Sequence, residues 1–410
     1  MVYSFPTATH SFNLSLYIPA GPLFDEPKEA GISHFYEHAV FRNINKLMDY
    51  KLYSVLDSLG LTLSGATYNE LIQFSVQGAP SHFRRAVEIL LLALSPFVIS
   101  KTELDAERER VKREIREDTY SSSVDAMCQK LVWGDTPLGQ TITGTVGNVS
   151  GFSLNRLKSH AEKITGAENI FFYLTGAIDE GDVEWLVEKV NKIPLPKSEK
   201  RENIAKLPPR FFHRSPDLSI KRADYCKIKF AYDVDTTLFP KPVRDLVYDI
   251  LFQGDTSRVF LELSEKNGYI YSFDANLDEY KNIGSLTLSF ETSPAHFLPA
   301  VEALREIFDG ITKNITESEL SLAKVPYLEN YLFILDDTES LNWNKAWESH
   351  FLGFDYETLE ARREAYGKVT VEDVLHCARE IFRPENLSVA VKHKSPDRAR
   401  AALQETFFVI

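Results

Sequence analysis

The two halves of the chain repeat one pattern, and this repeat limits the possible folds more than any other feature. Residues 74–83 read FSVQGAPSHF and residues 288–297 read LSFETSPAHF, and an Ala-Val-Glu triplet follows each at Ala86 and Ala300. A repeat of about 200 residues is too long for one unit of a solenoid. With 410 residues, the chain also exceeds the size of one ordinary core. We therefore expect two tandem homologous domains.

Periodic patterns give both halves the same order of elements. Alternating apolar and polar residues predict strands, and a helical spacing of apolar residues predicts the helices between them. The predicted strands are 11–18, 71–76, 227–232 and 285–290. The predicted helices are 29–59, 81–94, 102–118, 241–252 and 296–311. Because strands and helices mix without strict βαβ alternation, we expect an α+β fold with helices packed on antiparallel-rich sheets.

The stretch between the halves predicts the domain boundary. It is rich in Pro, Lys and Glu and lacks periodicity, which is typical of a linker. We expect a first domain at 1–195, a linker at 196–215 and a second domain at 216–410.

Charge and cysteine content exclude several classes of protein. The formal net charge is −13, whereas a face that binds nucleic acid is basic. No apolar run approaches the roughly 20 residues of a membrane-spanning helix, and residues 1–10 do not look like a secretory signal. The three cysteines are scattered, which favours a reducing compartment. We expect a cytoplasmic protein without a nucleic-acid partner or a membrane span.

The pentapeptide His34-Phe-Tyr-Glu-His38 carries the strongest chemical signal. On a helix, His34 and His38 project from one face about one turn apart, so their neutral imidazoles can bind one Zn²⁺. Glu37 lies near the same face and suits a carboxylate that takes a proton from an attacking water. This H-x-x-E-H order is that of an inverted zincin. A pair of core histidines is the plainer interpretation, but a carboxylate buried beside them would need a partner.

A catalytic zinc site needs a third protein ligand and one open position. The predicted helix 102–118 offers Glu107 and Glu114, which are seven residues apart and therefore share a face. Either carboxylate could be the ligand, and the other would then orient a histidine. The spacing alone does not choose between them.

Residues 30–42, AGISHFYEHAVFR, resemble the signature of the M16 family of insulinase, pitrilysin and mitochondrial processing peptidase. That family has a Gly-x-x-His-Phe-x-Glu-His-x-x-Phe pattern and a third zinc ligand about 76 residues after the second histidine, within a Glu-x6-Glu helix. Glu114 stands 76 residues after His38. The resemblance implies that Glu114 is the ligand, that Glu107 is the supporting carboxylate, and that both domains have the LuxS/MPP-like fold.

The resemblance also implies a substrate strand and a second catalytic group. Residues 64–70, SGATYNE, look like the edge strand that pairs with substrate, so Ser64, Gly65, Ala66 and Thr67 are expected to bind peptide. Residues 257–272 resemble the family's second half, in which an Arg and a Tyr seven positions apart polarise the scissile carbonyl. Tyr271 matches the Tyr and is expected to be catalytic.

Three features depart from the family pattern. The chain begins at what would be the family's second strand, so we expect the first strand to be absent or supplied differently. Ser64-Gly65 replaces the usual Asn-Ala of the edge strand, and Ser264 stands where the Arg is expected. In some members one chain brings zinc and another brings the Arg/Tyr pair. We therefore expect the zinc-bearing subunit of a heterodimer, with a homodimer or a lone enzyme using Tyr271 as the alternative.

The second half is expected to lack a metal site in either alignment of the repeat. Aligning Phe74 with Leu288 puts the apolar or aromatic residues Tyr248, Leu251 and Phe252 at the positions of His34, Glu37 and His38. A shift of three residues offers Asp245 and Asp249 instead, but it places Val325 at the position of the third ligand. One half would then be catalytic and the other would hold substrate.

These observations predict a zinc-dependent endopeptidase that cleaves peptides or unfolded segments, with Glu37 as the general base. Small members of the family also act in the maturation of ribosomally made peptides, which suggests leader removal as a role. The alternative is a catalytically weak subunit that binds peptides or serves assembly, and the missing Arg at Ser264 favours it.

Overall fold

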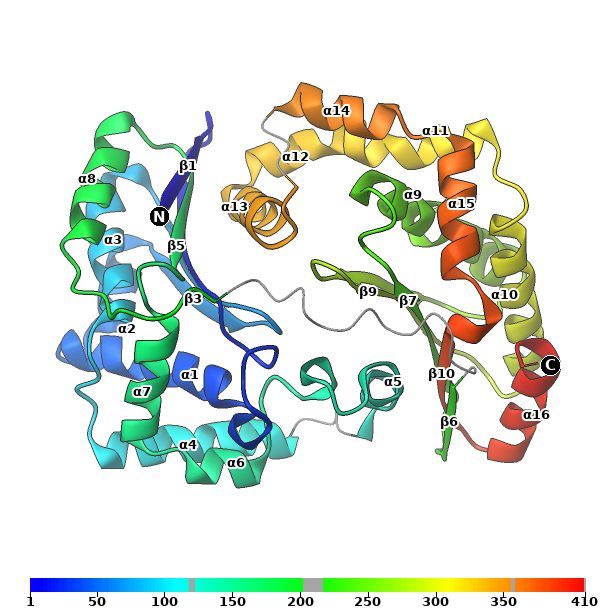
Figure 1. Cartoon of the computed structure of the whole chain (residues 1–410), viewed down its shortest axis with the longest axis horizontal. Helices are drawn as coiled ribbons and strands as arrows, with labels where there is room; N and C mark the ends of the chain where they lie inside the picture. Colours follow the sequence, from blue (N-terminus) through cyan, green and yellow to red (C-terminus); the bar gives the residue numbers. More distant parts are fainter. Residues whose placement is uncertain (118–121, 202–216, 355–357, 409–410) are drawn as a thin grey trace. The chain divides into compact units, whose positions relative to one another are not determined.

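The structure, a computed structural model, describes residues 1–117, 122–201, 217–354 and 358–408. The chain forms two compact units (Figure 1). Unit 1 comprises Met1–Asp118, Asp135–Ile204 and Leu332–His350, and unit 2 comprises Thr119–Gly134, Ala205–Tyr331 and Phe351–Ile410. Much of the expected linker, residues 202–215, lies outside the described residues.

Unit 1 is built on a five-stranded sheet with the order β1-β5-β2-β4-β3. Its strands are β1 (Val2–Pro6), β2 (Phe12–Ile18), β3 (Thr62–Thr67), β4 (Ile72–Gly78) and β5 (Phe171–Gly176). β1 runs parallel to β5, and every other neighbouring pair is antiparallel. This order leaves β3 at one edge of the sheet.

The two faces of this sheet differ in their contacts, because successive side chains of β2 point to opposite faces. Phe12, Leu14 and Leu16 belong to an apolar core shared with α1, α3, α7 and α8. Tyr17 points to the opposite face, where its hydroxyl donates to Asn342 of α13 at 2.8 Å. Figure 1 shows α1, α3 and α8 on one side of the sheet and α13 on the other. The helices are α1 (Ile32–Leu47), α2 (Leu52–Leu59), α3 (Phe83–Leu91), α4 (Lys101–Glu117), α6 (Val146–Gly151), α7 (Leu154–Ile164), α8 (Glu180–Asn191) and α13 (Thr338–Ala346).

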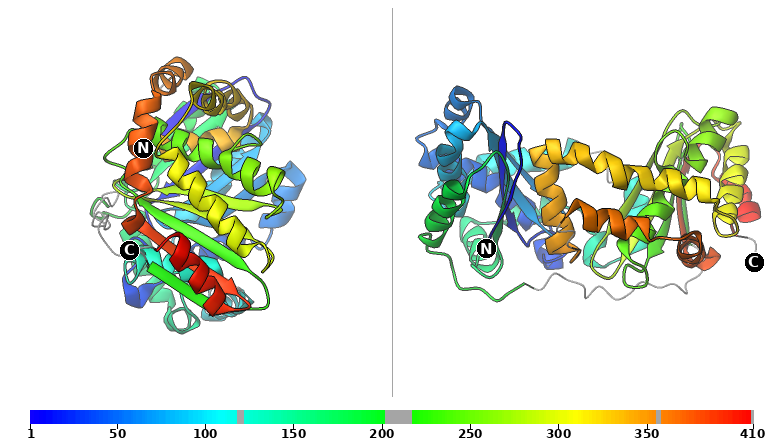
Figure 2. Two further views of the ribbon diagram at one scale, coloured as in Figure 1. Left: turned by 90° about the vertical axis from the view of Figure 1, so that its right-hand side faces the viewer. Right: turned by 90° about the horizontal axis from the view of Figure 1, so that it is seen from above.

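Unit 2 repeats this plan with the order β6-β10-β7-β9-β8, again with one parallel pair, β6 and β10. Its strands are β6 (Asp217–Arg222), β7 (Lys227–Val234), β8 (Phe273–Glu279), β9 (Gly284–Glu291) and β10 (Leu387–His393). Its helices are α5 (Val124–Trp133), α9 (Lys241–Phe252), α10 (Phe297–Ile311), α11 (Glu317–Val325), α14 (Leu359–Gly367), α15 (Val371–Ile381) and α16 (Pro396–Thr406), while α12 (Tyr331–Asp336) begins at the unit boundary. Figure 2 (left) shows α10 and α16 across one face of the sheet. The expected α+β fold and the tandem repeat are confirmed.

Each unit also contains a helix from the other half of the sequence. α5, from the first half, packs on β10 and β7 of unit 2, and Lys229 there contacts Asp125 at 2.6 Å. α13, from the second half, packs on β5 and β2 of unit 1. Both polar faces of the sheets are covered in this way.

Two expectations about local structure were wrong. The first strand is present: Val2–Pro6 forms β1, whose partner β5 lies about 170 residues away, so no local pattern reveals the pairing. The predicted helix 29–59 is two helices, α1 and α2. They are separated by a tight turn in which Asp49 and Tyr50 adopt φ of 51° and 60°, which ends the first helix.

Candidate metal centre

Close backbone contacts fix the start of helix α1. Gly31 precedes the helix with φ of 88°, a conformation that glycine adopts without strain. A Cβ on Gly31 would lie 2.5 Å from the Thr143 carbonyl oxygen, so only glycine allows this approach. Two residues on, the Ser33 hydroxyl donates to buried Asp25 at 2.7 Å. These contacts set the direction in which the next residues of α1 project.

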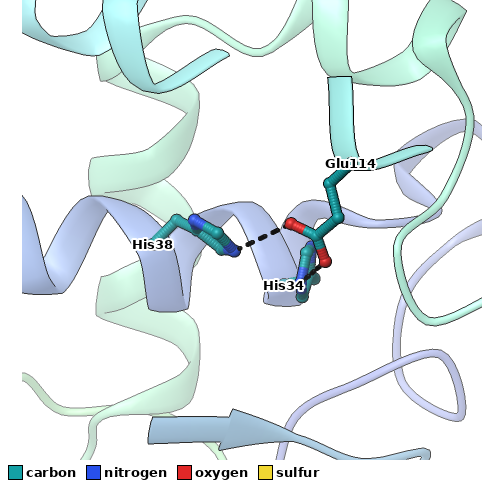
Figure 3. Close-up of side chains that lie close together, drawn as sticks. All are labelled: His34, His38 and Glu114. Atoms are coloured by element: carbon teal, nitrogen blue, oxygen red, sulfur yellow. Dashed lines mark ion pairs between the residues drawn. The ribbon is translucent and has the colours of Figure 1, made fainter. Parts of the chain in front are cut away.

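The structure brings His34, His38 and Glu114 together (Figure 3). Nε2 of His34 lies 3.4 Å from Oε1 of Glu114, and Nε2 of His38 lies 3.4 Å from Oε2. The two imidazoles come from α1 and the carboxylate from α4. Four ligands at ~2.0–2.1 Å around a tetrahedral zinc are separated by about 3.4 Å, so these distances suit one ion.

Glu107 lies behind His38 and orients it. Nδ1 of His38 donates to Oε1 of Glu107 at 3.0 Å, and Arg42 donates to Oε2 through Nε at 2.8 Å and Nη2 at 2.6 Å. With both oxygens occupied, Glu107 has the position of a supporting carboxylate. Arg42 was missed by the sequence reasoning, although its place one turn after His38 on the same helix was a usable signal.

The donor atoms of the site fit a cation. Because Nδ1 of His38 carries the proton given to Glu107, the lone pair of Nε2 faces the Glu114 carboxylate. Burial lowers the pKa of His38, but the hydrogen bond with Glu107 and the nearby carboxylates outweigh it and raise the pKa. The contact with His34 lowers the pKa of Glu114. A proton or a metal ion must therefore lie between these groups, and the two-nitrogen, one-oxygen set is one that zinc accepts.

Glu37 lies on the same helix and contacts the edge strand. Thr67 of β3 donates its hydroxyl to Oε2 of Glu37 at 3.0 Å. A Cβ on Gly65 would lie 2.5 Å from the Phe41 ring and 3.2 Å from Oε1 of Glu37. Gly65 therefore lets β3 pack closely on α1, which accounts for a glycine there. Ser64 and Ala66 lie on the same strand, with Ser64 exposed.

The structure places the remaining predicted residues in unit 2. Tyr271 precedes β8 and has a side chain that is 97% exposed. Ser264 lies in a short π-helical segment, Phe260–Lys266, just before it. Of the predicted catalytic and metal-binding residues, only Tyr271 belongs to unit 2.

Within the described parts of the chain, no second group of three or more His, Cys, Asp or Glu residues has metal-binding geometry. In the part of the chain that the structure describes, no helix is both long enough and apolar enough to cross a membrane.

Comparison with known proteins identifies the family of the chain. Residues 1–146 match the family described as insulinase (peptidase family M16), and residues 151–325 match the peptidase M16 inactive domain. The chain belongs to the M16 peptidase family. The matched first region contains His34, His38 and Glu114.

Relatives within the M16 family are named as zinc proteases. The chain is 23% identical to an uncharacterized zinc protease of Mycobacterium leprae, over 92% of this chain and 85% of that protein. It is 22% identical to an uncharacterized zinc protease of Bacillus subtilis, over 91% and 90%. The beta subunit of the mitochondrial-processing peptidase of Saccharomyces cerevisiae is 26% identical over 47% of this chain and 42% of its own.

Solved structures of other proteins share the fold. A peptidase M16 inactive domain from Pseudomonas fluorescens superimposes with a TM-score of 0.83 at 16% identity, covering 96% of this chain and 95% of the other. A protease from Helicobacter pylori gives the same TM-score at 15% identity, covering 96% and 97%.

Proposed function

We propose that this M16 protein is a zinc-dependent endopeptidase whose metal is held by His34, His38 and Glu114. The observation that carries the proposal is the convergence of two imidazole nitrogens and one carboxylate at 3.4 Å, with Glu37 beside them. When bound, zinc would polarise the scissile carbonyl and lower the pKa of water toward about 7. Three protein ligands leave one position open, as a catalytic site requires.

Glu37 is the proposed general base. Its carboxylate accepts a hydrogen bond from Thr67 at 3.0 Å, which holds it at the boundary between α1 and the edge strand. There it takes a proton from the water that attacks the scissile carbonyl and delivers the proton to the leaving amine. Glu107 and Arg42 keep the His38 ring in the orientation described above.

The proposed substrate is an extended peptide that adds a strand beside β3. β3 pairs with β4 on one side and forms the edge of the sheet on the other within the described residues. Its backbone along Ser64–Thr67 can therefore hydrogen-bond to a peptide. Since Glu37 contacts this strand at Thr67, a peptide bound there would reach the base. Removal of a leader from a precursor peptide is one role that fits an extended substrate.

We further propose that this chain is the zinc-bearing subunit of a pair. The expected Arg is replaced by Ser264, and Tyr271 is fully exposed on unit 2. A second M16-like chain would bring the missing cation to the scissile carbonyl, while a homodimer would rely on Tyr271. The cytoplasmic location is likewise a proposal, based on the three scattered cysteines.

The second candidate function is a peptide-binding or assembly subunit with little activity of its own. Ser264 favours it, whereas the complete ligand set disfavours it. A fluorogenic peptide library with added zinc separates the two when wild type is compared with Glu37→Gln, and with Glu109→Gln as a control on the exposed face of α4. Activity in wild type and control but not in Glu37→Gln supports the enzyme. If wild type, Glu109→Gln and Glu37→Gln all show the same background hydrolysis, alone and with candidate M16 partners, the enzyme function is contradicted.

The same assay tests the partner. Ser264→Arg restores the expected Arg to the chain, so its activity without a partner should rise if the missing cation limits the reaction. Activity of wild type alone that neither Ser264→Arg nor a second M16-like chain increases would contradict the heterodimer.

A further inference from the structure

A pocket of about 610 Å³ lies in unit 1, away from the metal ligands. It is bounded by the end of α3 and the turn after it, by α7, and by the end of α8. Its mostly apolar lining includes Leu91, Leu92, Leu94, Phe97 and Ile193. The volume lies within the range of about 300–1,000 Å³ that small-molecule sites occupy. The pocket is therefore large enough for a ligand and belongs to no site described so far.

Tyr36 connects this pocket to the helix of the metal centre. It lies two residues after His34, so at about 100° per residue its side chain leaves the opposite side of α1. The side chain is 2% exposed, lines the pocket and packs edge-on against Phe97, with 5.7 Å between ring centroids. Its hydroxyl has no hydrogen-bond partner among the described residues. Although the residue as a whole is buried, its hydroxyl oxygen is not sealed off from the pocket, so it can donate a hydrogen bond to a ligand there.

The charges around the pocket favour an anion. The charged residues of the lining are Lys158, Lys189, Lys192, Glu88 and Glu162. Glu88 is already paired with Arg85 at 3.0 Å, and Lys192 is paired with Glu188. Lys158, Lys189 and Glu162 then remain, so the lining of the pocket has a net positive charge. The whole chain, in contrast, has a net charge of −13.

We propose that this pocket binds a small apolar carboxylate, a molecule with an aliphatic or aromatic body and one carboxylate group. The apolar body fills the space lined by the leucines and Phe97. The carboxylate accepts the hydrogen bond that the Tyr36 hydroxyl has to give, and it attracts a lysine ammonium, whose four-carbon stem lets it move toward the ligand. This inference does not depend on peptidase activity, because binding requires neither metal nor substrate.

Isothermal titration calorimetry of the full chain with decanoate, below its micelle concentration, tests the proposal. Decanol and decyltrimethylammonium share the aliphatic chain but lack the negative charge. We expect saturable binding of one decanoate per chain, about tenfold or more tighter than decanol, and no binding of the cation. Absence of saturable decanoate binding, or equal binding of all three compounds, overturns the proposal.

Two variants place the ligand in this pocket. Tyr36→Phe removes only the hydroxyl and should weaken decanoate binding about tenfold. Ala161→Trp puts a large ring into the pocket from α7 and should abolish binding. Tyr53→Phe, an exposed tyrosine on α2, is the matched control and should bind as wild type does. Circular dichroism checks that each variant is folded. Wild-type affinity in both pocket variants overturns the proposal, and if Tyr36→Phe does not fold, Ala161→Trp decides alone.

Discussion

Units 1 and 2 have the same strand order, but the helix next to the edge strand carries different chemistry in each. In unit 1, Glu37 of α1 approaches Gly65 of β3; in unit 2, the Tyr248 hydroxyl of α9 donates to the carbonyl of Ala275 of β8 at 2.9 Å. Gly65 and Ala275 are equivalent, because they pair with the aligned residues Phe74 and Leu288. Glu37 therefore corresponds to Tyr248.

This correspondence selects one of the two alignments of the repeat. In this alignment Asp245 of unit 2 corresponds to His34 of unit 1, and Asp249 corresponds to His38. In unit 2 a lysine supplies the positive charge: Nζ of Lys241 lies 2.7 and 2.9 Å from the Asp245 oxygens and 3.4 Å from Glu279. The same place in the fold thus holds the three proposed metal ligands in unit 1 and an internal ion pair in unit 2.

The turn before the fourth strand of each unit shows a smaller difference. The amide of Tyr68 donates to the Leu71 carbonyl in unit 1, and the amide of Tyr280 donates to the Ile283 carbonyl in unit 2, both at 2.8 Å. At the third position of this turn, unit 1 has buried Glu70 and unit 2 has Asn282. Unit 1 therefore carries an ionisable group where unit 2 carries an amide.

The comparison predicts its largest effect at Glu37. Glu37→Gln removes the proposed base but leaves the three ligands, so kcat should fall by about 10²–10⁴-fold while zinc content stays the same. The corresponding change in unit 2, Tyr248→Phe, should alter kcat little. Peptide hydrolysis with metal analysis of the same samples measures both. A similar loss of activity in the two variants would contradict the assignment of chemistry to unit 1.

The next effect is expected on the stability of unit 2. Arg244 and Glu279 are both buried and pair with each other, so Glu279→Gln leaves a buried cation without its partner. The free energy of unfolding should fall by about 3 kcal/mol, with zinc content unchanged. Denaturant unfolding of the metal-free protein measures it. Loss of zinc in Glu279→Gln would show that the network of unit 2 is not separate from the metal site.

Glu107→Gln should weaken zinc binding by about 10–100-fold, since the variant orients His38 less firmly and cannot neutralise Arg42. Competition with a chelator measures the affinity, and Glu109→Gln on the same helix is the control. Unchanged affinity would mean that Glu107 only supports packing.

The effect that is smallest per unit of the variable changed concerns pH and Glu70. Burial raises the pKa of Glu70 to about 8, so the folded protein binds a proton there that the unfolded chain releases above its pKa of about 4.5. Glu70 therefore stabilises the fold at low pH, and this contribution is lost as pH rises toward 8, by about 1 kcal/mol per pH unit. Glu70→Gln, which has an amide as unit 2 does, should show a flatter dependence. Urea midpoints between pH 5 and 8 measure it, and parallel curves for the two proteins would contradict the prediction.

Much of the fold could be predicted because its signals are local. The strand 71–76 and the helix 241–252 were predicted close to their observed bounds, β4 (Ile72–Gly78) and α9 (Lys241–Phe252), since periodicity within a segment marks each of them. The exchange of α5 and α13 between units could not be predicted, because the pattern of a helix shows that one face is buried but not which sheet buries it.

The metal site likewise has features that the sequence predicted and features that it could not predict. The spacing of His34 and His38 on one helix predicted their convergence. The choice between Glu107 and Glu114 depends on how α4 packs on α1, which periodicity does not reveal. The Thr67 contact with Glu37 joins residues 30 positions apart and needed the sheet to be assembled.

Zinc stoichiometry tests the central claim most directly. Purified wild type, His38→Ala and Asp249→Ala, which removes the equivalent side chain of unit 2, are each dialysed against buffered zinc and analysed for metal. We expect one zinc per chain in wild type and in Asp249→Ala, and less than about a tenth of that in His38→Ala, because only two of the three protein ligands remain there. Equal zinc in wild type and His38→Ala, or loss of zinc only in Asp249→Ala, would contradict it.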